Sequence, residues 1–137
     1  MTQIYVGGCA CGAIRYQTSA EPVFENHCHC RDCQKRSGTG HSSYLTFPDR
    51  EVVTISGEAK VWRLKGDSGD EKAHAFCSDC GTPVYLTFNA APEAIAVHAG
   101  SLDEPGLFEP KVVTYGIRGH GWDVVDSGLR VFERMPE

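Results

Sequence analysis

Cysteine spacing is the feature of this sequence that most restricts the fold. The chain of 137 residues contains seven cysteines in three groups, namely Cys9 with Cys11, Cys28 with Cys30 and Cys33, and Cys77 with Cys80. Cysteines one or two residues apart can place two sulfurs on one metal ion, whereas a disulfide across so short a loop is strained. An odd number of cysteines also argues against a framework made only of disulfides. The spacing therefore predicts metal sites.

Seven sulfurs can be divided between metal ions in two ways. In the first grouping, the first and third groups form a closed four-sulfur site, and the second group forms a site with three ligands. In the second grouping, Cys28 and Cys30 join Cys77 and Cys80, and the first group is left over. Ligand counting favours the first grouping, because it uses every cysteine and separates a closed structural site from an open catalytic one.

A histidine is the obvious fourth ligand for the three-cysteine group. If residues 26–30 are extended, Cys28 and Cys30 point to one face while His27 and His29 point to the other, so these two histidines are poorly placed. A lone histidine in a strand-like segment is more often a hydrogen-bonded structural residue than a ligand. The sequence leaves three such candidates open, His41, His74 and His98.

Short runs of β-branched and aromatic residues alternate with Gly, Pro, Asp and Ser, a pattern typical of a mainly β fold. The pattern predicts strands at residues 3–7, 13–18, 22–28, 42–47, 51–56, 59–64, 72–77, 84–88 and 95–99, with a tenth near 129–133. Only RDCQKRS, residues 31–37, resembles a helix. We expect short antiparallel strands and one short helix in a single domain over residues 1–137, with Trp62 and Trp122 packed in the core.

Charge and hydropathy restrict the partners. The formal net charge is −5, which gives no sequence-wide electrostatic reason to bind nucleic acid. No apolar run approaches the roughly 18 residues of a membrane span, and the start MTQIYVGG lacks the basic and apolar segments of a secretory signal. We therefore predict a cytoplasmic protein with no nucleic-acid partner and no membrane association.

Four motifs, GGCACGAIRY, CHCRDCQKRSG, FCSDCGTPVY and AGSLDEPG, stand in this order along the chain. Together they resemble the glutathione-dependent formaldehyde-activating enzyme family, which also includes centromere protein V. The resemblance runs from Gly8 to about Pro136 and implies a zinc-stabilised β-tent fold with two zinc ions. It implies a structural zinc on Cys9, Cys11, Cys77 and Cys80 and a catalytic zinc on Cys28, Cys30 and Cys33. The segment EPKVV lacks a histidine that the family pattern has there.

The resemblance also implies a reaction, the addition of the glutathione thiol to formaldehyde to give S-hydroxymethylglutathione, which classes the enzyme as a carbon-sulfur lyase. Glutathione carries two carboxylates, and Arg31 and Lys35 are cations beside the three-cysteine group. On a helix these two side chains share a face, so we expect them to bind glutathione.

Two other functions fit the same motifs. The first is a non-catalytic, zinc-stabilised module that binds a protein, because a fold does not fix a function. The second keeps the chemistry but uses a different thiol or a different small electrophile.

Overall fold

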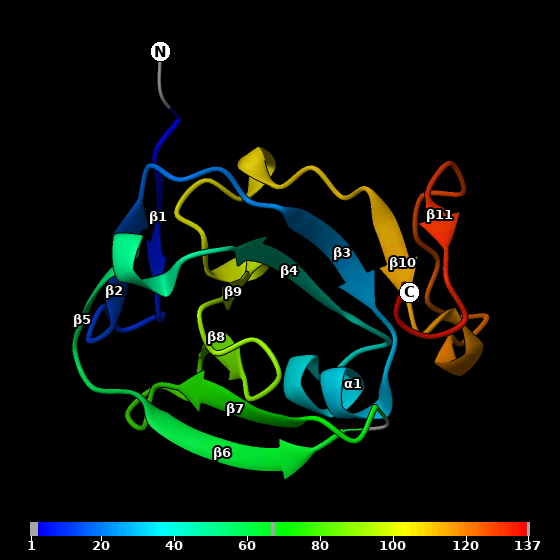
Figure 1. Ribbon diagram of the computed structural model, residues 1–137, viewed down its shortest axis with the longest axis horizontal. Helices are drawn as coiled ribbons and strands as arrows, with labels where there is room; N and C mark the ends of the chain where they lie inside the picture. The colour runs from blue at the N-terminus through cyan, green and yellow to red at the C-terminus, as the bar shows by residue number, and fades with distance from the viewer. Residues whose placement is uncertain (1–2, 67, 137) are drawn as a thin grey trace.

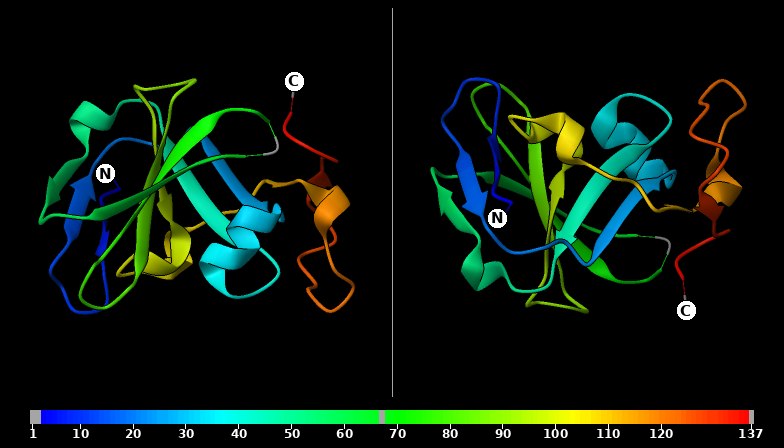
Figure 2. Two further views of the ribbon diagram at one scale, coloured as in Figure 1. Left: turned by 90° about the horizontal axis from the view of Figure 1, so that it is seen from below. Right: turned by 90° about the horizontal axis from the view of Figure 1, so that it is seen from above.

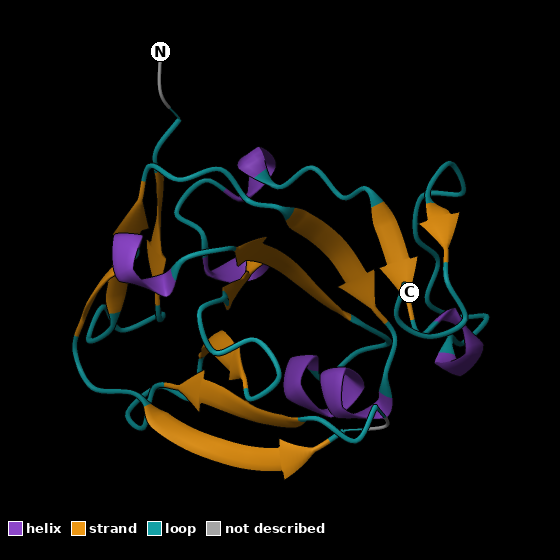
Figure 3. Cartoon of the chain, viewed as in Figure 1, coloured by secondary structure: helices purple, strands orange, loops and turns teal. Residues whose placement is uncertain are grey.

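The computed structural model describes residues 3–66 and 68–136, and within them the protein is mainly β with one α-helix (Figures 1 and 3). A small antiparallel sheet has the order β1-β2-β5, formed by β1 (Tyr5–Gly8), β2 (Arg15–Thr18) and β5 (Thr54–Ser56). This sheet brings the turn after β1, with the first cysteine pair, to one edge of the molecule.

The larger sheet has eight strands in the order β11-β10-β3-β4-β9-β8-β7-β6. Its strands are β3 (Phe24–Cys28), β4 (Ser42–Phe47), β6 (Lys60–Lys65), β7 (Glu71–Phe76), β8 (Pro83–Phe88), β9 (Ile95–His98), β10 (Val112–Thr114) and β11 (Arg130–Val131). The sheet curves, so β3 and β4 lie on one side and β6 and β7 on the other (Figures 1 and 2). The second cysteine group begins at the end of β3, and the third group lies just before the start of β8.

The two faces of the larger sheet belong to two apolar clusters. On β4, Leu45 and Phe47 point into the main core with Val97 of the neighbouring β9. Tyr44, which precedes Leu45 and so lies on the opposite face of the strand, joins a second cluster with Ala96 and the three cysteines of the second group. Because side chains alternate along a strand, one strand builds both the core and the wall of the site.

Helix α1 (Arg31–Ser37) has the bounds that the sequence predicts. Cys30 is its N-cap, and its sulfur accepts a hydrogen bond from the Cys33 amide. The helix ends at Gly38, whose φ of 77° is left-handed and whose amide bonds the Gln34 carbonyl, a common helix C-terminus. The N-cap of the helix is thus itself one of the predicted metal ligands.

Four short 3-10 helices complete the described elements, η1 (Arg50–Val52), η2 (Ala99–Ser101), η3 (Pro105–Leu107) and η4 (Gly116–Arg118). None of the helices in residues 3–66 and 68–136 has the length and apolar character needed to cross a membrane.

The structure corrects the sequence-based fold in four places. The predicted strand 51–56 is shortened to β5, because the Asp49 side chain caps η1 over its first residues. Strand β10 was not predicted, and its pairing with β3 and with β11 is parallel, so the large sheet is mixed rather than antiparallel. Trp62 and Trp122 were expected in the core, but 56% and 68% of their surfaces are exposed.

Candidate metal centres and pocket

The first and third cysteine groups meet in one cluster. The sulfurs of Cys9, Cys11, Cys77 and Cys80 all lie within 4.8 Å of one another. The Sγ of Cys11 is 3.6 Å from that of Cys9 and 3.7 Å from that of Cys77. A tetrahedral ion bound at about 2.3 Å from each sulfur requires separations of this size. The donor set and its spacing therefore fit a closed four-sulfur metal site.

Two glycine-assisted turns hold this four-cysteine cluster. Gly12 and Gly81 follow the second cysteine of each pair, with left-handed φ values of 82° and 78°, which glycine adopts without a steric penalty. The Ile14 amide donates to the Cys9 sulfur at 3.2 Å. Hydrogen bonds from Thr82 lower the pKa of Cys80 to about 5. These donors favour thiolates, the form that binds metal.

The second cysteine group forms a separate cluster that is buried. Cys28 ends β3, Cys30 caps α1 and Cys33 lies in its first turn, and their sulfurs also fall within 4.8 Å of one another. The adjacent thiols of Cys30 and Cys33 hold the pKa of Cys28 well below its usual value, and Cys28 in turn raises the pKa values of Cys30 and Cys33. The cluster therefore favours a thiolate even before a cation binds.

This arrangement is the first of the two groupings that the sequence allows. Cys28 and Cys30 do not join the third group, and none of His27, His29 or His41 lines the pocket at the three sulfurs. Within the described residues, the cluster of three sulfurs includes no fourth histidine, cysteine or carboxylate ligand.

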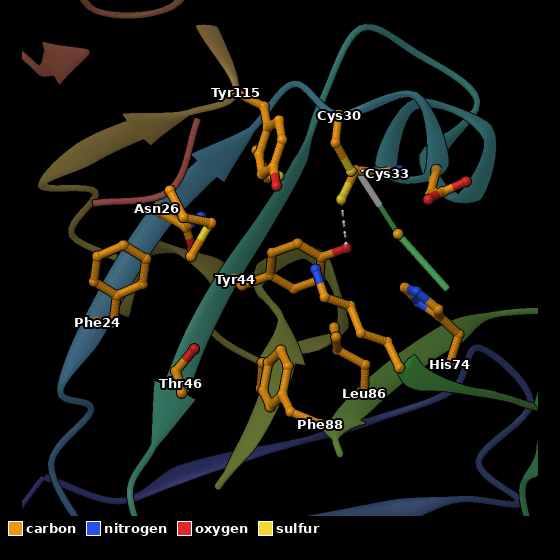
Figure 4. A pocket seen from close by; sticks show the side chains of 16 residues that line it. Phe24, Asn26, Cys30, Cys33, Tyr44, Thr46, His74, Leu86, Phe88 and Tyr115 are labelled. Carbon is orange, nitrogen blue, oxygen red and sulfur yellow. Dashed lines mark hydrogen bonds between the residues drawn. The ribbon is translucent and has the colours of Figure 1, made fainter. Parts of the chain in front are cut away.

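The three sulfurs lie in the wall of a pocket between α1 and the two sides of the curved sheet (Figure 4). The pocket has an empty volume of about 610 Å³, a figure that includes its open mouth. Aromatic and aliphatic side chains make up much of the lining: Phe24, Leu86, Phe88, Ala96, Tyr115 and Met135. The polar side chains are Asn26, Asp32, Tyr44, Thr46, Lys72 and His74.

Tyr44 connects the sulfur cluster to the pocket. Its hydroxyl lies 3.2 Å from the Cys33 Sγ, as the dashed line in Figure 4 marks. Burial, followed by the charge of Cys33, raises the pKa of Tyr44 well above its usual value. The hydroxyl therefore keeps its proton and can donate a hydrogen bond to a Cys33 thiolate. The sequence pattern placed Tyr44 on a strand but gave no sign of this contact.

His74 on β7 is the least satisfied polar side chain of the pocket. Only 4% of its surface is exposed, and neither ring nitrogen has a hydrogen-bond partner within the described residues. Burial, helped by the charges of Arg36 and Lys72, lowers the pKa of His74 to about 4. At neutral pH the ring is uncharged, with one donor and one acceptor nitrogen. Such an unpaired buried group is costly unless a ligand uses it.

The other two histidine candidates, His41 and His98, do not line the sulfur pocket. His98 on β9 packs its ring against that of Tyr44, with 4.8 Å between ring centroids, and it lines a second hollow rather than the sulfur pocket. His41 follows α1, and its Nδ1 is 2.6 Å from an Asp123 oxygen. Of the three candidates left open by the sequence, only His74 lines the sulfur pocket.

Arg31 and Lys35, the cations expected to bind glutathione, are exposed residues of α1. The Arg31 guanidinium bonds the Gln34 side chain, and neither Arg31 nor Lys35 is part of the pocket lining. The lysine that lines the pocket is Lys72 on β7. Sequence reasoning missed Lys72 because it is distant in sequence from the three-cysteine group, and the sheet topology brings it to that group.

Residues 4–117 match the family model for the glutathione-dependent formaldehyde-activating enzyme, and this range includes all seven cysteines. The chain belongs to the glutathione-dependent formaldehyde-activating enzyme family. Family membership therefore confirms the resemblance seen in the motifs. The matched range ends before Met135, so part of the pocket wall lies outside it.

A crystal structure of a Rhodobacter sphaeroides protein is similar to this chain with a TM-score of 0.57 and 20% sequence identity. The match covers 77% of this chain and 96% of that one. At this identity the similarity concerns the fold alone, and it agrees with the mainly β architecture.

Proposed function

We propose that the protein is a zinc-dependent carbon-sulfur lyase of the S-hydroxymethylglutathione synthase type, which adds the thiol of glutathione to formaldehyde. The observation that carries the proposal is a buried three-sulfur cluster in the wall of a largely apolar pocket, beside a separate four-sulfur cluster. Family membership supports the same activity.

The two clusters have different roles in this proposal. Cys9, Cys11, Cys77 and Cys80 would hold a structural zinc, since four sulfurs complete its tetrahedral coordination. Cys28, Cys30 and Cys33 would hold the catalytic zinc, because three protein ligands leave a position for substrate. Zinc bound there supplies a Lewis acid that lowers the pKa of a thiol or polarises a carbonyl oxygen.

The protein side chains supply orientation and hydrogen bonds. In the addition, a carbon–sulfur bond forms and the carbon–oxygen π bond breaks. The thiol loses one proton, and the former aldehyde oxygen gains one to become the new hydroxyl. The neutral His74 offers an N–H for the aldehyde oxygen, where negative charge develops. Its lowered pKa makes it a better hydrogen-bond donor than a base. Tyr44 holds the Cys33 sulfur at 3.2 Å and so fixes one wall of the reacting space.

The glutathione carboxylates need cationic partners. Lys72 is the better supported partner, because it lines the pocket and an ammonium group pairs with a carboxylate. Arg31 and Lys35 stay proposed partners for the part of the tripeptide that extends beyond the pocket mouth. The seven free cysteines suit a reducing compartment such as the cytoplasm.

The test follows the interconversion of formaldehyde, glutathione and the adduct at equilibrium by exchange NMR, because the uncatalysed reaction reaches the same end point. Zinc-loaded protein should raise the exchange rate in proportion to its concentration. Cys33→Ala should lose this effect while keeping the zinc of the four-cysteine cluster. An exchange rate equal to the background with fully loaded protein contradicts the proposed reaction.

The apolar lining favours a second candidate, the same addition with a larger and more apolar electrophile or thiol. Phe24, Phe88 and Met135 offer surface that formaldehyde is too small to cover. A thermal-shift series of aldehydes of increasing size, each with glutathione present, distinguishes the two. Stabilisation that grows with chain length supports the second candidate, and a flat series contradicts it.

A further inference from the structure

A third cluster of metal-ligand side chains lies outside the two cysteine clusters. One ligand atom each from His29, His41 and Asp123 falls within 4.8 Å of the other two. The Asp123 Oδ2 is 2.6 Å from the His41 Nδ1 and 3.6 Å from the His29 Nδ1. Only 5%, 20% and 11% of the His29, His41 and Asp123 side chains is exposed. The cluster is thus largely removed from bulk water.

Hydrogen bonding alone explains only two of these three side chains. The His41 and Asp123 contact is a short hydrogen bond. The His29 Nδ1, in contrast, is buried and has no hydrogen-bond partner within residues 3–66 and 68–136. A buried polar atom without a partner is costly and unusual. The 3.6 Å separation between this nitrogen and the Asp123 oxygen is too long for a hydrogen bond. It is close to the separation of two ligand atoms on one metal ion.

The donor set and spacing match a transition-metal site. Imidazole nitrogens and carboxylate oxygens bind zinc at about 2.0–2.2 Å, so two ligands of one ion stand about 3–3.5 Å apart. The two measured separations bracket this range. Two histidines and one carboxylate, with open positions for water, suit divalent zinc, iron or cobalt. The third separation, between the ligand atoms of His29 and His41, is no more than 4.8 Å.

The elements around the cluster explain how the sequence builds it. His29 lies between Cys28 and Cys30, and the alternation of the extended chain turns it away from the sulfur pocket. Asp123 comes from the loop after η4, which Figure 2 shows in orange beside the cyan segment that carries α1. Gly40 contacts Asp123 so closely that a Cβ there would lie 2.4 Å from the carboxylate. The missing side chain at Gly40 makes room for the Asp123 side chain.

We propose that His29, His41 and Asp123 form a third metal site, which binds a divalent transition-metal ion such as zinc and fastens the loop containing Asp123 to the back of the three-cysteine segment. The site does not rest on the glutathione reaction. Its ion would leave both cysteine clusters as they are.

The test begins with the full chain loaded with two zinc ions, to which cobalt(II) is added. An additional equivalent of cobalt should bind with the weak visible bands of nitrogen and oxygen ligands. Strong thiolate charge-transfer bands would instead report exchange into the cysteine clusters and would count against the site. Asp123→Ala should weaken the additional binding at least about tenfold, whereas the control Asp126→Ala, in the same loop and bonded to the nearby Gly128 amide, should not change it.

His41→Gln provides a second variant in case the loss of Asp123 loosens the loop. It should also lose the additional cobalt while retaining two zinc ions and the circular dichroism of the wild type. Failure of the wild type to bind a third ion overturns the proposal. Undiminished binding in both Asp123→Ala and His41→Gln overturns it equally.

Discussion

The unpaired His74 gives a prediction in which stability and activity change in opposite directions. His74→Leu removes an imidazole of which 4% is exposed and whose two nitrogens have no partner within the described residues. Each unsatisfied buried polar group costs about 1–3 kcal/mol. An apolar side chain of similar volume removes this cost, so the free energy of unfolding should rise by about 1–3 kcal/mol.

The same variant should be a poor enzyme. A single hydrogen-bond donor placed where negative charge develops contributes a factor of about 10²–10³ in rate, equivalent to about 2.7–4 kcal/mol. His74→Leu should lose a factor of this size in exchange rate, whereas His74→Gln, which keeps an N–H donor, should recover part of it. Neither substitution is expected to lower the free energy of unfolding enough to prevent folding.

Denaturant unfolding of the zinc-loaded proteins measures the first effect, and exchange NMR with glutathione and formaldehyde measures the second. The pairing of more stability with less activity identifies a functional group for which the fold carries a cost. If His74→Leu is less stable than the wild type and equally active, His74 is an ordinary core residue and the argument is refuted.

Three further predictions concern other parts of the site. Tyr44→Phe removes the hydroxyl at 3.2 Å from the Cys33 sulfur, and competition with a chelator should show about 10–100-fold weaker zinc binding at the three-cysteine cluster; unchanged competition rejects the contact. A chelator series with thiol counting should free the three-cysteine cluster before the closed four-cysteine one, and the reverse order contradicts our assignment of the open site. Burial lowers the pKa of His98 to about 4 in the folded protein, whereas an unfolded histidine has a pKa of about 6.5. Between these two pH values the unfolded chain therefore binds a proton that the folded protein does not. Stability should therefore fall as pH drops from about 6.5 toward 4, and His98→Asn should flatten this part of a pH-dependent unfolding curve.

Much of the fold is local enough to be predicted from the sequence. The helix bounds agree because RDCQKRS lies between an N-capping cysteine and a left-handed glycine. Most predicted strands begin and end within a few residues of the observed ones, because a half-buried strand shows an alternation of apolar and polar residues in the sequence. Strand β10 was missed because it has three residues between a proline-containing segment and Tyr115, whose φ of 55° ends it. Its parallel partners are set by tertiary contacts.

The candidate site divides in the same way. The cysteines could be grouped by counting, because a closed structural zinc site takes four protein ligands and an open catalytic site takes three. Lys72 and His74 could not be assigned, because nothing local distinguishes a strand residue that faces a pocket from one that faces the core. The unpaired nitrogens of His74 and the contact between Tyr44 and Cys33 exist only once β4 and β7 stand on opposite sides of the curved sheet.

The position of Met135 has a consequence for how substrate choice can change. This side chain lines the pocket, but it comes from the tail beyond the residues that match the family model. The sulfurs and this part of the pocket wall therefore come from different parts of the sequence. A substitution at Met135 can change the size or polarity of the pocket, and with it the molecules that the pocket admits, while the cysteine clusters stay the same.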